Sequence, residues 1–424
     1  MSRTSFSQRL IFVTAVVALS WSPVAHGDAV VDWNTIAVDT ISAASPPRPG
    51  PVPLLDIAVV QAAIYDAVQA IGGKYKPYKV QVPGASGSPD AAVAKAARDV
   101  LVSIFPDKSE LLDTTYRGYL TKNGLAENDP GVAVGEKAAA GIITLHASNV
   151  RVPNPLPDPF KGDTKPGMWR PTTSYQSGAP ASGLAMAAPW LGAVPCFVMQ
   201  NGDQFRAKPP PALTSEQYAK DYNEVKTLGA FNSTRTEQQN ELAQFYTGLS
   251  LKTWQLPLRE MVAKHVDKID DSARLMALGS LAMADAVITA WDSKKQYVFW
   301  RPVTAIQEGE DDGNPATIGD PAWQPMLNTP PYPEYTSGAN NVTAALTRTL
   351  ALFFGKDDMP FMVTSTNPQS AQKTRTYNRF SEMVSDMVDV RIYHGVHFRF
   401  ADEAAREQGT KVAEWVFSHV AAQR

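Results

Sequence analysis

The chain has 424 residues, of which 44% are hydrophobic and 19% are charged, and this is the composition of a soluble globular protein with one or two cores. Its formal net charge of −3 argues against the strongly basic surface of a nucleic-acid-binding protein. Cys196 is the only cysteine, so no intramolecular disulfide can form.

The N-terminus has the three-part order of a secretory signal. Arg3 and Arg9 precede the apolar run 10–20, and small residues close the segment at Gly27. The apolar run is too short for a comfortable membrane span, which makes an uncleaved anchor the second interpretation. Cleavage of residues 1–27 predicts a secreted or periplasmic protein with no stable membrane span and a formal net charge of −5.

Helical periodicity dominates the rest of the chain, with alanine-rich amphipathic segments and no convincing strand. The most apolar of these segments carries Asp285 in its middle, a buried acid that would need a partner. About nine or ten helices are expected, which predicts an all-α fold built from helical bundles. The predicted helices cover residues 54–71, 90–105, 131–147, 271–293, 337–354, 368–388 and 402–420, with two more that begin at Thr214 and Thr234.

A proline-rich segment, residues 153–211, interrupts the helices and holds twelve of the 33 prolines. Such a segment cannot be a continuous helix or a central strand, and its scattered aromatic residues argue against a solvated linker. We expect a long ordered loop that wraps the body and covers the mouth of a site. It divides an N-terminal helical part, 28–213, from a C-terminal helical bundle, 214–424.

Three short patches in the C-terminal part carry the candidate chemistry. Lys294 and Arg301 flank an aromatic stretch, where a lone cation is most often stacked or snorkelling. Ser337 and Gly338 begin a predicted helix, and such a position can cap the helix and also bind an anion.

The third patch contains Arg391, His394, His397 and Asp402 around a glycine turn. If the patches converge, two arginines could make forked contacts to a tetrahedral oxyanion, and a lysine could add a point charge. His397 could then act as a nucleophile or as a metal ligand. The sequence cannot show that the patches converge.

These patches resemble the three-part signature of the vanadium-dependent haloperoxidases, which is shared with the type 2 phosphatidic acid phosphatase superfamily. The resemblance implies helical bundles with the site in the C-terminal half. It implies that vanadate or phosphate oxygens are bound by one set of residues and that His397 bonds to vanadium. The implied oxyanion-binding residues are Lys294, Arg301, Ser337, Gly338, Arg391 and His397, and Trp291, Pro330, Tyr332 and Asp402 match positions in a halide pocket or behind the site.

The chain departs from this signature at two positions. The family's Pro-Ser-Gly-His reads Thr336-Ser337-Gly338-Ala339 here, and Val390 precedes Arg391 where serine is usual. Ala339 removes the histidine that serves as acid or base, and His394 is a candidate substitute. A phosphatase that uses His397 as its nucleophile should lose roughly 10²–10⁴ in rate without a positioned acid. A peroxidase cycle should suffer less, because vanadium is itself a Lewis acid.

The leading hypothesis is a secreted vanadium haloperoxidase-like enzyme that uses hydrogen peroxide, a halide and a small organic substrate, with vanadate as cofactor. The first alternative is an acid phosphatase of the same superfamily. The second is a non-catalytic protein that binds phosphate or vanadate, since phosphate could occupy the same site.

Overall fold

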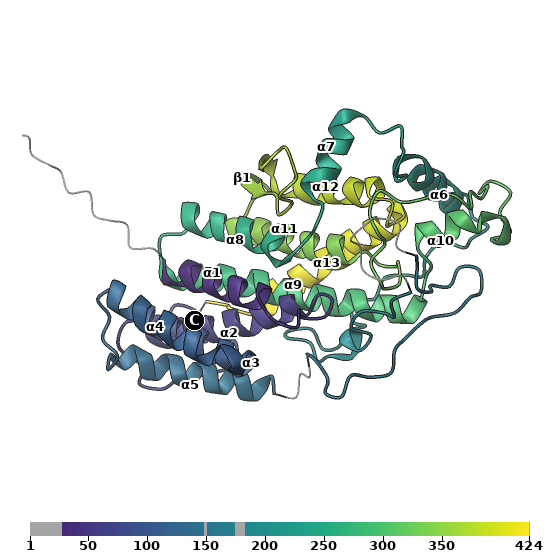
Figure 1. Cartoon of the computed structure of the whole chain (residues 1–424). Helices are drawn as coiled ribbons and strands as arrows, with labels where there is room; N and C mark the ends of the chain where they lie inside the picture. The colour runs from purple at the N-terminus through teal and green to yellow at the C-terminus, as the bar shows by residue number, and fades with distance from the viewer. Residues whose placement is uncertain (1–27, 148–150, 174–182, 424) are drawn as a thin grey trace, which may run out of the picture.

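A computed structural model describes residues 28–147, 151–173 and 183–423, and the predicted signal segment lies outside these residues. The described part is built from α-helices arranged as two adjoining bundles (Figure 1). The N-terminal bundle contains α1 (Ala29–Ser42), α2 (Val52–Gly72), α3 (Pro89–Ile104), α4 (Ser109–Lys122) and α5 (Pro130–Leu145).

The C-terminal part contains eight of the thirteen α-helices found in the described residues, somewhat more than the nine or ten predicted for the chain. They are α6 (Glu216–Leu228), α7 (Glu237–Phe245), α8 (Leu251–His265), α9 (Ile269–Tyr297), α10 (Pro302–Gln307), α11 (Gly338–Phe354), α12 (Phe380–Tyr393) and α13 (Arg399–His419).

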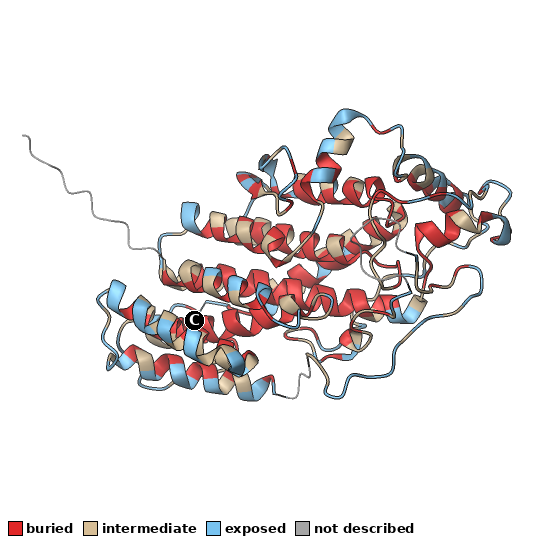
Figure 2. Cartoon of the chain, in the orientation of Figure 1, coloured by how far each residue is buried: buried red, intermediate tan, exposed pale blue. Residues whose placement is uncertain are grey.

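Helix α9 joins the two parts of the fold. It packs against α2 on the N-terminal side and against α11 and α13 on the C-terminal side. One large cluster of buried hydrophobic residues runs from Ala29 in α1 to Ala421 after α13. Figure 2 shows the buried residues on the facing sides of these helices. The core therefore continues across the boundary predicted at residue 213.

Two helices, α2 and α9, are long and apolar enough to cross a membrane. Their most apolar windows are 89% and 94% buried inside the protein, respectively. This burial accounts for their apolar character, because a central helix of a packed bundle is surrounded by other apolar surfaces on every side.

Local sequence explains where the helices begin. The Ser88 side chain accepts a hydrogen bond from an amide in the first turn of α3. Thr236 and Gln239 form a capping box at the start of α7. The sequence analysis placed the starts of α6 and α7 at Thr214 and Thr234, one and two residues too early, because neighbouring residues have similar capping side chains.

The expectation that no strand is present was wrong. Strands β1 (Asp358–Thr364) and β2 (Thr374–Arg379) form an antiparallel hairpin. In β1 the residues alternate between exposed and buried, which is the period of a half-buried strand. The helix predicted over 368–388 was therefore wrong in its first half, since α12 begins only at Phe380.

In the described residues of the proline-rich segment, 153–173 and 183–211, the only helix is the 3-10 turn Leu191–Ala193. Its backbone is tied to α9 at several points. The carboxylate of Asp285 accepts hydrogen bonds from the amides of Phe197, Val198 and Met199 at 2.7–2.8 Å. The buried acid predicted in α9 thus has its partners in this segment.

Candidate functional site

The structure brings the three sequence patches together at the ends of four helices. Lys294 lies in the last turn of α9, and Arg301 is the residue before α10. Ser337 precedes α11, and Arg391 lies in the last turn of α12. His397 follows in the turn before α13. All five side chains are buried, so their polar groups must find partners in the protein or in a ligand.

Lys294 is fully buried beneath the residues that precede α11. Its ammonium donates hydrogen bonds to the carbonyl oxygens of Pro333, Glu334 and Thr336 at 2.8, 3.0 and 2.5 Å. Burial, together with the nearby charge of Arg301, holds the pKa of Lys294 well below its usual value. Lys294 therefore orders the loop in front of α11, and its three carbonyl acceptors oppose the loss of its proton.

Arg301 is held by backbone carbonyls but not completely. Its Nε donates to Tyr332 O at 2.9 Å and its Nη1 donates to Val396 O at 2.6 Å. The guanidinium lies over the Tyr332 ring, 4.9 Å from the ring centroid. Its buried Nη2 has no hydrogen-bond partner in the protein. One face of this guanidinium is therefore available to an acceptor that the protein does not supply.

Arg391 has the same property. Its Nη1 donates to His394 Nδ1 at 3.1 Å, while its buried Nε has no partner in the protein. A buried unmade hydrogen bond from a charged donor is costly, by about 1–3 kcal/mol or more. Two such donors on two arginines of one site indicate that an anion completes it.

His397 is oriented by a carboxylate that the sequence analysis did not single out. Its Nδ1 lies 2.9 Å from Glu334 Oε1, and its Nε2 lies 3.3 Å from Arg301 Nη1. The Phe398 amide donates to the same Glu334 oxygen at 3.0 Å. A carboxyl group on one ring nitrogen fixes the tautomer, as in histidines that bind metals. A ligand at the other nitrogen, Nε2, would replace its 3.3 Å contact with Arg301.

Burial shapes the charge of this pair. It raises the pKa of Glu334 to about 8, and it holds the pKa of His397 well below its usual value, with the nearby cations acting in the same direction. Both side chains are therefore favoured in their neutral forms near pH 7. The guanidinium charges of Arg301 and Arg391 are consequently not neutralised by the acid beside them.

Asp402 lies behind the start of α11. Its Oδ1 accepts a hydrogen bond from Asn340 Nδ2 at 2.7 Å, and Asn340 Nδ2 also lies 3.4 Å from Ser337 Oγ. Burial raises the pKa of Asp402 well above its usual value. Ser337 stands at the N-cap position of α11 without a side-chain capping bond, and its hydroxyl instead hydrogen-bonds with Asp402. The first amides of α11 are therefore not capped by this side chain.

The position of His394 argues against the acid–base role suggested for it. The side chain is fully buried, and both ring nitrogens are engaged, Nδ1 by Arg391 and Nε2 by the carbonyl of Ala243 at 2.9 Å. Burial also lowers the pKa of His394 to about 3. A histidine held in this way supports Arg391 and bridges α12 to α7, and it has no free nitrogen for a proton relay.

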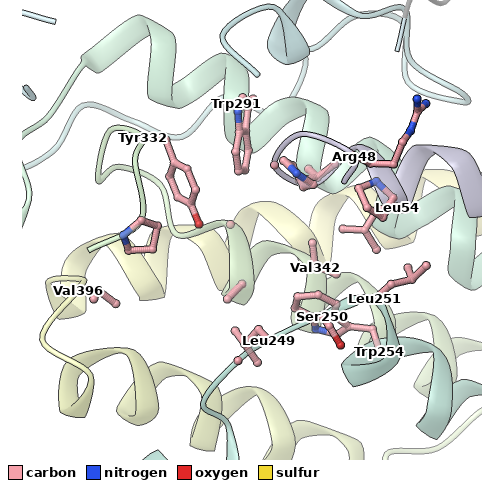
Figure 3. Close-up of a pocket in the computed structure, with 18 of the residues that line it drawn as sticks. Arg48, Leu54, Leu249, Ser250, Leu251, Trp254, Trp291, Tyr332, Val342 and Val396 are labelled. Carbon is pink, nitrogen blue, oxygen red and sulfur yellow. The ribbon is translucent and has the colours of Figure 1, made fainter. Parts of the chain in front are cut away.

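A cavity of about 510 Å³ opens directly onto the site (Figure 3). His397, Arg391, Gly338 and Ala339 lie at one end of it. Trp291, Pro330 and Tyr332, which the resemblance places in or near a halide pocket, all line the cavity. A Cβ at residue 338 would lie 3.1 Å from the Trp291 ring, a tight contact that favours glycine at this position.

The described residues of the proline-rich segment do not line this cavity, contrary to the expectation that the segment covers its mouth. The cavity walls come from residues 41–54 and 248–254, together with α9, α11 and the 327–332 turn. No described residue of 153–211 lines the cavity. The segment instead packs behind Trp291, whose Nε1 donates to Ala187 O at 3.1 Å.

The donor set fits a tetrahedral oxyanion and a single histidine bond. Within the described residues, no group of three or more His, Cys, Asp or Glu side chains could hold a metal cation. The site instead offers cations, the start of a helix and one imidazole nitrogen. The residues present therefore fit vanadate, in which the oxygens carry the negative charge, and they fit phosphate equally well.

Sequence comparison finds similarity to vanadium haloperoxidases. Residues 274–424 match the family model of the VCPO second helical-bundle domain. The vanadium chloroperoxidase of Curvularia inaequalis is 31% identical over an alignment of 181 residues. That alignment covers 32% of this chain and only 29% of the fungal protein.

The fold as a whole resembles solved bacterial structures. A vanadium-dependent iodoperoxidase superposes with a TM-score of 0.75 and 24% identity, covering 93% of this chain and 95% of the other. An apo-type vanadium-dependent chloroperoxidase superposes with a TM-score of 0.67 and 18% identity, covering 87% and 92%. At these identities the superpositions establish the fold, and both bundles share it.

Proposed function

We propose that this chain is a vanadium-dependent haloperoxidase-like oxidoreductase. Its residues 274–424 match the model of the VCPO second helical-bundle domain, and its whole fold resembles those of solved vanadium haloperoxidases. Its reaction would be the oxidation of a halide by hydrogen peroxide. The observation that carries the proposal is the pair of buried, unpartnered donors, Arg301 Nη2 and Arg391 Nε, beside His397.

The residues of the site would have different roles in binding vanadate. Arg301, Arg391 and Lys294 would balance the charge of vanadate, and the hydroxyl of Ser337 with the first amides of α11 would hold its oxygens. His397 would bind through Nε2 while Glu334 holds Nδ1. Bound vanadate would supply a Lewis acid that activates peroxide. The burial of the site would exclude bulk water from these contacts.

Ala339 stands where the resemblance places an acid–base histidine. Among the described residues, His397 is the only histidine that lines the cavity. His394 cannot replace the missing histidine, because both of its ring nitrogens are already hydrogen-bonded. Proton transfer at the site would then depend on water or on Asp402, which is held near Ser337 through Asn340. The proposed activity would therefore depend on the Lewis acidity of vanadate more than on acid–base catalysis by a histidine.

The test is the bromination of a dye by purified protein with hydrogen peroxide, bromide and increasing orthovanadate. We expect a rate that saturates with vanadate and is lost in His397→Ala. The protein prepared without its first 27 residues serves for all measurements, and calorimetry in parallel shows whether vanadate binds. Binding of vanadate without any vanadate-dependent turnover would refute the proposed activity.

The same site would also accept phosphate, so an acid phosphatase is the second candidate. It predicts release of phosphate from an aryl phosphate, with vanadate as a competitive inhibitor. The lack of a second histidine beside His397 disfavours it, because a leaving group needs a positioned acid. A third outcome, binding of phosphate or vanadate without either turnover, would identify an oxyanion-binding protein.

We also propose export of the protein, on the strength of the Arg3–Gly27 segment alone. The N-terminal sequence of the protein purified from its native source tests this. A mature chain that begins at Asp28 is expected, and a chain retained in the cytoplasm with residues 1–27 intact would contradict it.

A further inference from the structure

The cavity beside the oxyanion site is larger and more apolar than halide and peroxide need. Both of those reactants are small and polar, whereas the cavity of about 510 Å³ is in the size range of pockets for drug-sized organic molecules. Its walls away from His397 are formed by Leu54, Leu249, Trp254 and Val342, with Trp291 and Tyr332 nearer the site (Figure 3).

The one charged side chain among the described residues that line this part of the cavity is paired. Arg48 contacts the buried Asp56 at 2.7 and 3.0 Å, and Asp56 also accepts a hydrogen bond from Arg151 at 2.9 Å. The Trp254 indole nitrogen is satisfied by Thr343 Oγ1 at 2.9 Å. The paired charge and the satisfied indole mean that this part of the cavity offers apolar and aromatic surface and would favour an uncharged ligand.

Ala339 makes the cavity continuous with the oxyanion site. It lies in the first turn of α11, and Val342 follows it one turn later on the same side of the helix. A large side chain at residue 339 would separate the apolar wall from His397. With alanine there, a molecule that rests on Val342 and Leu249 reaches the residues that would hold vanadate.

We propose that this cavity binds a neutral, apolar aromatic molecule, held between the aliphatic wall and the Trp291–Tyr332 pair, as the acceptor of the oxidised halogen. The Trp291 and Tyr332 ring centroids lie 4.9 Å apart with the rings tilted by 51°, which gives an aromatic ligand one flat surface and one edge to contact. The acceptor role rests on the proposed function, but binding does not.

The reaction balances with the reactants already named. Halide loses two electrons, and peroxide accepts them as it is reduced to water with one proton taken up. The halogen then forms a bond to an aromatic carbon, and the hydrogen of that carbon leaves as a proton. In sum, X⁻ + H₂O₂ + H⁺ + ArH gives ArX + 2 H₂O. Binding next to His397 would direct the halogen to one ring position rather than to whichever position reacts fastest in solution.

The first test measures binding alone, without vanadate or peroxide. 1-Naphthol, a neutral bicyclic phenol, is titrated into the protein by calorimetry. We expect binding that weakens at least tenfold in Leu249→Trp, because the larger side chain fills the cavity from a partly exposed position. Leu111→Trp is the matched control, since Leu111 is 62% exposed on α4 and far from the cavity, and it should bind like the wild type.

A second variant, Ala339→Leu, fills the cavity from the opposite side and carries the test if Leu249→Trp does not fold. No binding of 1-naphthol, or equal binding in wild type and both filled variants, would overturn the proposal. Binding of 1-naphthyl phosphate without any binding of 1-naphthol would also overturn it, because the ligand would then be an anion recognised by the arginines.

The second test uses the protein with vanadate, peroxide and bromide. The ratio of ortho- to para-brominated naphthol is compared with the ratio given by free hypobromous acid. A ratio that differs at least twofold in the wild type and in Leu111→Trp, but returns to the solution value in Leu249→Trp, supports the acceptor role. The same ratio as in solution for every protein that turns over would refute it, even where the first test shows binding.

Discussion

Two groups of buried charges in this molecule differ in how completely they are paired. Asp66 and Asp285 each accept three backbone amides, and none of their oxygens lacks a partner. At the oxyanion site, Arg301 Nη2 and Arg391 Nε have no partner in the protein. The first arrangement holds loops onto helices, and the second is complete only with a ligand. Completeness of pairing therefore distinguishes these two carboxylates from the two arginines of the site.

The largest effect expected from this comparison is the loss of a paired carboxylate. Asp285→Ala would leave three amides of residues 197–199 without acceptors, at about 1–3 kcal/mol for each buried group. We expect the free energy of unfolding in urea to fall by about 3–5 kcal/mol. Asp158→Ala, at an exposed loop position, should change it by less than about 0.5 kcal/mol. Equal effects would show that the amides are satisfied in another way.

The next largest effect is a pH dependence of the free energy of unfolding that comes from Glu334. Because burial raises the pKa of Glu334 to about 8, the folded protein holds a proton that the unfolded chain releases. Stability from this group is complete below about pH 4.5 and is lost as the pH rises towards 8. In phosphate-free buffer, Glu334→Gln should remove about 2–3 kcal/mol of the decline between pH 5 and 8. Parallel pH profiles of wild type and variant would contradict this.

A matched pair of arginine variants tests whether the unpaired arginine binds the anion and the paired arginine stabilises the fold. Arg391→Met should weaken orthovanadate binding tenfold to a hundredfold, while the anion-free protein changes in stability by no more than about 1 kcal/mol. Arg235→Met is the control, because Arg235 donates to Asn240, Ala230 and Tyr393 and is a paired arginine. It should lose stability and keep its affinity for the anion. The reverse result would invert the assignment of the two arginines.

The smallest effect concerns His394. Because its ring nitrogens serve Arg391 and the Ala243 carbonyl, His394→Asn should lower stability by about 1 kcal/mol and leave vanadate-dependent turnover within about threefold of the wild type. Turnover is measured with bromide and peroxide at saturating vanadate. A loss of a hundredfold or more at unchanged vanadate affinity would restore His394 to the acid–base role.

Much of this arrangement could be predicted from the sequence, because it depends on local patterns. The apolar helix α9, the glycine that ends α2 and the start of α11 all have short-range signals. The convergence of the three patches was a hypothesis that rested on their spacing and was joined by a resemblance. The family-model match over residues 274–424 supports that resemblance, and the geometry shows Arg301 and His397 together.

Other features depend on contacts between distant residues and gave no local signal. Glu334 lies in a proline-rich turn, where an acid is usually solvated, and only the approach of His397 makes it a partner. The β1–β2 hairpin was missed because its strands are short and β2 is mostly exposed. The cavity wall joins residues 41–54 to residues 248–254, and no spacing along the chain could have paired them.

The most direct test of the central claim is a calorimetric titration of orthovanadate into the protein, repeated with Arg391→Met. The unpartnered donors of Arg301 and Arg391 predict binding of one vanadate per chain, weakened at least tenfold in the variant. At a hundred times the dissociation constant, that vanadate should also stabilise the wild type by about 2.7 kcal/mol. Absence of binding at millimolar orthovanadate, or equal affinity in the two proteins, would contradict the account.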